Sequence, residues 1–215
     1  MSCMTHERSE LRMNRTSQKS VAYRQNEVSD AKRHIMAQAA ALIAERGYGS
    51  VGISEIGDVA GFGKGALYYH IGSKEELLFD IMTDYMIDLN EAARGIVARV
   101  KEPEKRVIEL SRSFLTIMFR SRAEMTVCFR EAHALGDEKR NRVLAMHAEY
   151  QDLWAMVLKE GSAAGEFRPV PKLQLKALLG MYFHSFLWIN TARPGSDKAI
   201  ADSFAEIVLR TSKKA

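Results

Sequence analysis

The chain has 215 residues, of which 47% are hydrophobic and 27% charged, proportions typical of a globular protein with one sizeable domain or a small domain joined to a larger one. Its apolar runs stay below the ~20 residues of a membrane-spanning helix, and its polar N-terminus lacks a signal-peptide core, so we expect a cytoplasmic protein with no membrane partner. The net charge of +4 permits a nucleic-acid partner, but the first 101 residues carry equal numbers of basic and acidic side chains, so a case for DNA binding has to rest on a motif.

Residues 1–26 precede the first regular pattern. They are polar and carry scattered arginines and a lysine between Arg8 and Arg24. This composition fits a flexible basic arm and a disordered leader equally well. A helix is expected from about Ser29 to Gly47, because glycine readily takes the positive φ that ends a helix. Its apolar face consists of Ile35, Ala39, Leu42 and Ile43.

The glycine-rich stretch GFGKG that starts at Gly61 first suggests a phosphate-binding loop. Gly61, Gly63 and Ala66 match the loose G-x-G-x-x-G/A pattern of dinucleotide sites. That pattern requires a β-strand before it, whereas the preceding residues have helical apolar spacing. A Walker A loop requires Ser or Thr after Gly-Lys, and here Gly65 follows Lys64. We therefore reject a nucleotide loop.

A helix-turn-helix explains the glycines better. Two short helices are expected over about 53–60 and 64–70, joined by a tight turn. Gly57 would let the helices cross closely, and Gly61 would take a positive φ in the turn. The small core beneath is expected to contain Val59, Leu67 and Leu77. The residues left for the outer side are Lys64, Gly65, Tyr68, Tyr69 and His70.

The remainder of the chain also has helical periodicity. Ser73 and Glu76 form a capping-box pattern that opens a helix of nearly 30 residues. Further helices are expected at about 104–120, 122–135, 140–164, 172–192 and 196–212, with breaks at Gly165, Pro169–Pro171 and Pro194-Gly195. No segment has the pattern of a strand, so the fold class is all-α.

The segment from about Ser29 to Leu78 resembles the TetR family of transcriptional regulators. The matching stretches are AAALIAERGY from Ala39, ISEI from Ile53, AGFGKGALYYH from Ala60 and SKEEL from Ser73. The resemblance implies a three-helix DNA-binding domain over 27–73 and a larger helical ligand-binding and dimerisation domain over 74–215. It also implies a double-stranded DNA operator, a small-molecule effector and a homodimer.

Residue by residue, the resemblance implies that Lys64 and Gly65 face the bases. The residues implied to contact mainly the DNA backbone, or to lie beside it, are Tyr68, Tyr69, His70, Lys74 and Ser54. Gly63 and Gly52 stand where the family usually has a capping Ser or Thr, and Ile71 stands where Phe is usual. Glycine is an adequate N-cap, so the fold is expected to survive, with two hydroxyl contacts to DNA lost.

The second part of the chain is rich in Met and aromatic residues. Such side chains adapt to irregular apolar ligands, although at helical spacing they also form ordinary cores. The residues expected to bind an effector are Phe114, Met118, Phe129, Met146, Tyr150, Trp154, Phe183, Trp188 and Arg130.

A finer resemblance concerns the kind of effector. Gly165-Glu-Phe-Arg168, Trp188 and Arg193-Pro-Gly195 are similar to TetR regulators of fatty-acid and steroid breakdown that sense acyl-CoA thioesters. Arginines that could meet the CoA phosphates are Arg120, Arg122, Arg130 and Arg140. The alternative is a regulator of an efflux system that senses a drug-like or cationic aromatic compound. A buried acid among the aromatics, such as Glu131 or Glu149, would favour that alternative.

Helices 172–192 and 196–212 are expected to form the dimer interface, with candidate residues Leu173, Leu175, Leu179, Tyr182, Phe186, Ile189, Ile200, Phe204, Ile207 and Val208. Enzymes and scaffold proteins are the rival classes. No nucleophile–base spacing or carboxylate pair supports an enzyme, and a scaffold would not explain the run from Lys64 to His70. Cys3 and Cys128 lack metal-ligand spacing, so we expect neither a metal nor a cofactor.

Overall fold

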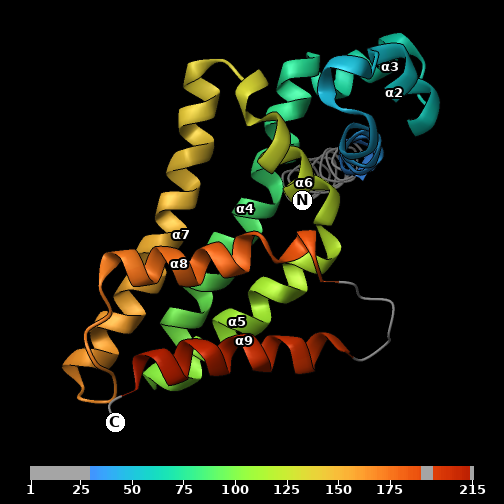
Figure 1. The fold of residues 1–215 in the computed structure, drawn as a ribbon. Helices are drawn as coiled ribbons and strands as arrows, with labels where there is room; N and C mark the ends of the chain where they lie inside the picture. Colours follow the sequence, from blue (N-terminus) through green and yellow to red (C-terminus); the bar gives the residue numbers. More distant parts are fainter. Residues whose placement is uncertain (1–29, 190–195, 214–215) are drawn as a thin grey trace, which may run out of the picture.

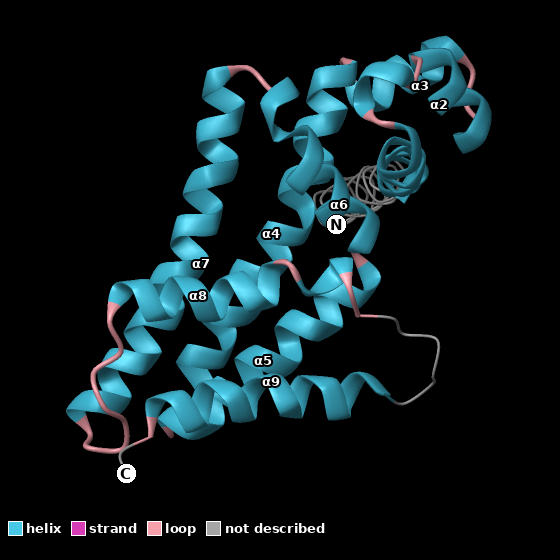
Figure 2. Ribbon diagram, viewed as in Figure 1, coloured by secondary structure: helices cyan, strands magenta, loops and turns pink. Residues whose placement is uncertain are grey.

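The computed structural model describes residues 30–189 and 196–213. The predicted basic arm over 1–26 and the break at Pro194-Gly195 lie outside these residues. Within them the chain is helical (Figure 2), and the β-type pairing in this part is one isolated bridge between Phe167 and Lys213. The predicted all-α class is confirmed.

The first helices form a small unit at one end of the molecule (Figure 1). A helix over 30–46 is followed by the 3-10 turn η1 (Tyr48–Ser50), then α2 (Ile53–Ala60) and α3 (Lys64–Ile71). Gly52 and Gly63 occupy the N-cap positions of α2 and α3 without a side-chain cap, as the sequence predicted.

Helix α4 (Lys74–Arg99) connects this unit to the rest of the chain. Ser73 caps it, because its Oγ accepts a hydrogen bond of 3.0 Å from the backbone N–H of Glu76. The other half of the predicted capping box is absent from the described contacts: the Glu76 carboxylate pairs with Lys139 at 3.2 Å instead of reaching back to Ser73. A tertiary ion pair thus replaces the local bond.

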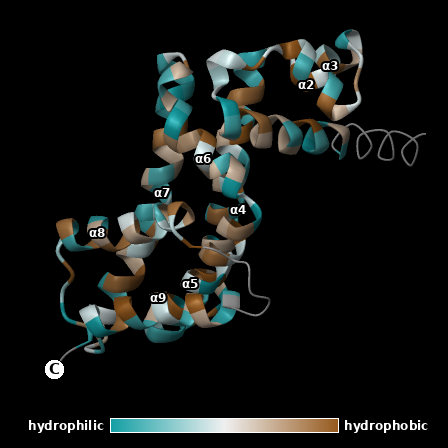
Figure 3. Cartoon of the chain, turned by 45° about the vertical axis from the view of Figure 1, so that its right-hand side comes forward, coloured by the Kyte–Doolittle hydropathy of each residue, from teal (hydrophilic) through white to brown (hydrophobic). Residues whose placement is uncertain are grey.

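The larger part of the molecule contains α5 (Pro103–Arg120), α6 (Arg122–Glu131), η2 (Ala132–Ala134), α7 (Asp137–Ala163), α8 (Lys172–Phe183), η3 (Ser185–Leu187) and α9 (Ser196–Ser212). Helix α4 packs along α7, and α5 packs along α9 (Figure 1). Each of these helices has brown hydrophobic and teal hydrophilic positions in Figure 3, as expected for helices that bury one face.

The predicted helix over 172–192 is wrong in length, because α8 ends at Phe183. The ring Nδ1 of His184 lies 2.9 Å from the Gly180 carbonyl, and Ser185 Oγ donates to the Tyr182 carbonyl at 2.6 Å. Side chains therefore occupy carbonyls at the helix end, which favours the turn η3 over continuation. Phe186 is buried as a result.

Aromatic side chains fill the centre of the larger part. Trp154, Tyr150, Tyr182 and Phe114 are among its largest fully buried side chains. The ring centroids of Phe114 and Tyr182 lie 5.3 Å apart, and the Tyr182 hydroxyl is 2.6 Å from Ser111 Oγ. Burial raises the pKa of Tyr182, so the hydroxyl stays protonated within this core.

Candidate DNA-binding surface and effector pocket

The glycines of the helix-turn-helix have the roles expected of them. A Cβ added to Gly57 would lie 2.7 Å from the backbone oxygen of Phe62, so a side chain would push the two short helices apart. Gly61 has a φ of 75° and ends α2, the first helix of the helix-turn-helix. Leu67 is fully buried beneath them, but Val59 is 49% exposed, so its predicted place in this core is wrong. Ile56 and Ala60 are buried on α2 instead, because they share one face of that helix.

Helix α3 presents its polar residues outward. Lys64 and Gly65 are exposed at its N-terminal end, and no ion pair between described residues involves Lys64. Tyr69 is 76% exposed and Tyr68 40%. Ser54 is exposed near the start of α2. The fold thus brings five of the seven predicted DNA contacts to the surface of one small unit.

The other two residues predicted to contact DNA, His70 and Lys74, instead pack against or bond to other residues of the protein. The half-buried His70 ring packs edge-on against Phe62 and Tyr69, with centroids 5.4 Å and 5.2 Å away. Lys74 Nζ donates to the Tyr48 carbonyl at 2.7 Å and lies 4.2 Å from the centre of the Tyr48 ring. These contacts give both residues a role in holding the unit together.

A set of polar contacts ties the small unit to the larger part. The Glu75 carboxylate accepts bonds from the Gly136 backbone N–H at 3.0 Å and from Lys139 at 3.2 Å. These bonds lower the pKa of Glu75 and keep it charged. Arg130, predicted to bind the effector, donates to the Ala44 carbonyl at 3.0 Å. Because Arg130 lies on α6, this bond links α6 to the C-terminal end of the helix over 30–46. A movement of α6 would therefore be transmitted to that helix.

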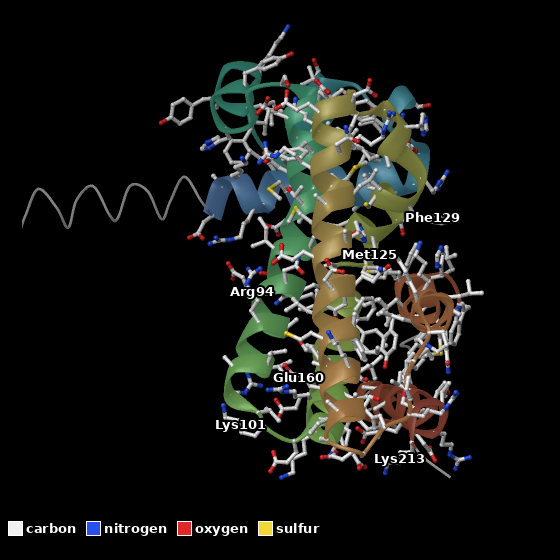
Figure 4. The ribbon with its side chains drawn as sticks, turned by 90° about the vertical axis from the view of Figure 1, so that its left-hand side faces the viewer. Arg94, Lys101, Met125, Phe129, Glu160 and Lys213 are labelled. Atoms are coloured by element: carbon white, nitrogen blue, oxygen red, sulfur yellow. The ribbon has the colours of Figure 1, made fainter. Side chains whose placement is uncertain are left out.

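An apolar cavity of about 540 Å³ opens between α4, α6, α7 and α8. Its lining consists of Tyr85, Met125, Cys128, Phe129, Ala132, Val143, Leu144, His147, Ala148, Gln151, Lys176, Leu179, Gly180, Phe183, His184 and Phe186. Figure 4 labels Met125 and Phe129 where α6 approaches α8. The size suits a small organic ligand.

Only two of the residues predicted to bind an effector, Phe129 and Phe183, line this cavity. Phe114, Met118, Tyr150 and Trp154 are buried in the core. Met146 lies beside α4, where its carbonyl accepts a bond from Asn90. Trp188 is 63% exposed and stacks on Phe204. Helical periodicity indicates buried positions such as Phe114 and Trp154, but it reveals neither the exposure of Trp188 nor which buried faces border the cavity.

The polar side chains of the cavity were missed as binding residues. The Tyr85 hydroxyl lies 3.3 Å from His147 Nε2, and Cys128 Sγ lies 3.8 Å from the same nitrogen. His147 falls four residues after the buried Val143 on α7, a spacing that is equally compatible with an ordinary core histidine. The position of Tyr85 opposite His147, 62 residues away, could not be inferred from periodicity.

No carboxylate lines the 540 Å³ cavity. Glu149 instead pairs with Arg94 on the surface. A second cavity of about 620 Å³ shares Gln151 with the first and is bordered by Lys159, Lys172 and Asp152. None of the ion pairs between described residues involves Lys159, Lys172 or Lys176. Both cavities are mainly apolar, and lysine ammonium groups lie at their borders, with the Asp152 carboxylate beside the second one.

The partly buried position of His147 makes the stability of the protein depend on pH. Burial lowers the pKa of His147 from 6.5 to about 4, so below pH 6.5 the unfolded chain binds a proton that the folded chain does not. The contribution of His147 to stability is therefore complete above pH 6.5 and is lost as the pH falls towards 4. We expect the free energy of unfolding of wild type to fall more steeply than that of His147→Leu in this window, by up to ~1.4 kcal/mol per pH unit. Urea unfolding at several pH values measures this, and parallel curves for the two proteins would contradict it.

No helix among the described residues is both long and apolar enough to cross a membrane. No group of three or more His, Cys, Asp or Glu side chains in the same residues is arranged to hold a metal ion.

The small unit has three helices, and the second helix of its helix-turn-helix is exposed. It is attached to a larger helical part that contains a cavity. This combination defines a DNA-binding regulator. Residues 35–81 match the family model of bacterial regulatory proteins of the tetR family, and residues 100–212 match that of the tetracyclin repressor-like C-terminal domain. Because the second match alone spans more than half of the chain, the protein belongs to the TetR family of transcriptional regulators.

Individual relatives agree with this assignment. The chain is 25% identical over 186 residues to the HTH-type transcriptional repressor KstR2 of Mycobacterium tuberculosis, covering 85% of this chain and 93% of the relative. The crystal structure of PfmR of Thermus thermophilus, a TetR family regulator, has a TM-score of 0.76 and 24% identity, covering 82% and 97% of the two chains. AibR in complex with isovaleryl coenzyme A and operator DNA has a TM-score of 0.71 and 29% identity, with the same coverage.

Proposed function

We propose that this protein is a dimeric repressor that acts in the cytoplasm and leaves its operator when an acyl-CoA thioester enters the cavity between α4, α6, α7 and α8. Residues 27–73 would be its DNA-binding domain and 74–215 its effector-binding and dimerisation domain. The observation that carries the proposal is the cavity itself, because Tyr85 of α4 lines it and α4 begins directly after α3. A ligand there acts on the helix that positions the DNA-binding surface.

The surface of α3 supports the DNA-binding half of the proposal. Lys64 has no ion-pair partner among the described residues, and the exposed Gly65 has no atom within 4 Å of an added Cβ. A lysine can bond to guanine in the major groove, and a bare glycine lets the helix come close to the bases. Two such helices in a dimer read half-sites about 34–36 Å apart.

The chemistry around the cavity supports an acyl-CoA over a cationic drug. Its mainly apolar walls lack a carboxylate that would pair with a cationic ligand, and Lys176 lies at its edge. Lys159 and Lys172 border the adjoining cavity beside Asp152, which leaves an excess of positive charge there. An acyl chain fits the apolar walls, and the phosphates of CoA fit the ammonium groups. AibR, a structural relative, was crystallised with isovaleryl coenzyme A and operator DNA.

The proposed dimer uses α8 and α9. Leu173 and Leu187 are 80% and 53% exposed, and Ile207 of α9 is 44% exposed. Large apolar side chains exposed on neighbouring elements are typical of surfaces that pair with another chain. Trp188, stacked on Phe204, extends this surface.

Fluorescence anisotropy with labelled DNA from upstream of the protein's own gene tests the proposal. We expect binding that is tighter than to a random duplex and that weakens steeply with salt, because counterions are released from the DNA. Decanoyl-CoA should release the DNA, whereas free CoA and tetraphenylphosphonium, a cationic aromatic probe, should not. Release by tetraphenylphosphonium alone would instead support the drug-sensing alternative, and release by neither probe would contradict the effector assignment.

A further inference from the structure

Three polar side chains meet inside the mainly apolar cavity. His147 comes from α7, Tyr85 from α4 and Cys128 from α6. The Tyr85 hydroxyl and the Cys128 thiol both face one atom, His147 Nε2, at 3.3 Å and 3.8 Å. The ring of Phe183, with its centroid 4.9 Å from that of His147, covers the imidazole.

The protonation state of this cluster follows from its burial. Burial raises the pKa of the Tyr85 hydroxyl and of the Cys128 thiol, so both keep their protons. Burial lowers the pKa of His147 to about 4, so its ring is neutral at pH 7. Both groups can therefore donate to Nε2, an arrangement that favours Nε2 as the unprotonated, accepting nitrogen. The single ring proton of His147 is then on Nδ1.

The Nδ1–H of His147 has no hydrogen-bond partner among the described residues. The same ring lines the cavity, where the other polar groups are Gln151, Lys176 and His184. A donor on a cavity wall that no protein group satisfies is open to a ligand that supplies an acceptor. The ammonium of Lys176 supplies no acceptor, and as an exposed residue it serves the mouth of the cavity.

We propose that His147 is a specificity-determining residue that donates a hydrogen bond from Nδ1 to an acceptor oxygen, such as a ketone carbonyl, within the apolar skeleton of the effector. Tyr85 is a positioning residue, because its hydroxyl holds the proton on Nδ1 by bonding to Nε2. The inference rests on the proposed function only in treating this cavity as the effector site.

This role selects among effectors of similar size. A saturated hydrocarbon chain would fill the cavity but leave Nδ1–H unbonded, whereas a chain or fused ring bearing a carbonyl would satisfy it. A site built to hydrogen-bond a ligand discriminates strongly against the analogue that lacks the polar group. The hydrogen bond from His147 to the ligand also places the ligand next to Tyr85, which lies on α4, the helix that follows α3.

Displacement of N-phenyl-1-naphthylamine, an uncharged fluorophore, measures this preference without DNA or CoA. The competitors are 2-decanone and 1-decene, which have equal chain length and differ in the carbonyl. We expect His147→Leu to weaken displacement by 2-decanone about three- to tenfold and to leave that by 1-decene unchanged. In His147→Asn the side-chain amide lies near the position of Nδ1, so this variant should restore the ketone preference. In His147→Gln the amide lies near the position of Nε2, so this variant should not restore it. Tyr85→Phe should give an intermediate loss.

Nitrogen-15 NMR of the wild-type protein provides a second readout that survives poor folding of any variant. We expect His147 to be protonated on Nδ1, and its Nδ1 resonance to shift when 2-decanone is added but not with 1-decene. A proton on Nε2, or equal displacement by ketone and alkene from wild type and His147→Leu, would overturn the proposal. Fluorophore binding together with failure of acyl-CoA to release DNA would count against the proposed function and not against this role.

Discussion

Replacing both Lys64 and Tyr69 with alanine is expected to weaken binding to the operator by roughly 100-fold, because a lysine bonded to a guanine edge alone contributes about 1–3 kcal/mol of discrimination. Both side chains are exposed on α3, and Lys64 has no ion pair within the described part of the chain. Their removal should leave the fold intact. Anisotropy titrations and thermal unfolding of the same samples measure both effects.

The matched control is Lys159→Ala, which removes an exposed lysine far from α3 along the chain. It should bind operator DNA like wild type. Lys74→Ala is unsuitable as a surface test, because Lys74 bonds to the Tyr48 carbonyl and covers its ring. If the Lys64 and Tyr69 double variant binds operator DNA as tightly as the Lys159 control, α3 does not dock in the way described.

Gly57→Val is expected to destabilise the helix-turn-helix by about 2–3 kcal/mol, because its side chain overpacks the crossing of the two short helices. Even a Cβ at this position would lie 2.7 Å from a backbone oxygen, which cannot turn away as a flexible side chain can. DNA binding should be lost with the unit. Chemical unfolding followed by circular dichroism measures the change.

Gly65→Ala separates packing from recognition in the same motif. No atom lies within 4 Å of a Cβ added there, so stability should hold or rise slightly with the better helix propensity of alanine. Affinity for the operator should nevertheless fall, because the new methyl group stands between α3 and the bases. Equal stability losses in Gly57→Val and Gly65→Ala would mean that the helices cross elsewhere.

The local features of the fold were predictable from sequence. Gly57, Gly61 and Ser73 act through neighbours a few residues away, so their roles follow from short patterns. The end of α8 at Phe183 was not predictable by periodicity, because it depends on side-chain bonds of His184 and Ser185 to helix carbonyls.

The exposure of the α3 residues was predicted better than the lining of the cavity, for a related reason. The residues of α3 act from one helix, and their exposure follows from its period. Cavity residues come from four helices, and packing decides which buried face borders empty space. Tyr85 and His147 meet there. Trp154 also falls on the inward face of its helix, but it lies in the close-packed core. Lys74 likewise depends on Tyr48, 26 residues earlier.

The most direct test of the account is to fill the cavity and measure effector-dependent release of DNA. Gly180 lines the cavity, and an added Cβ there meets no atom within 4 Å, so Gly180→Phe occupies space without a clash at Cβ, and Gly180→Ala is its control. We predict that all three proteins bind operator DNA equally and that Gly180→Phe needs at least about tenfold more decanoyl-CoA for release, a difference of about 1.4 kcal/mol. Release of all three at the same concentration would show that the effector acts outside this cavity and would contradict the account.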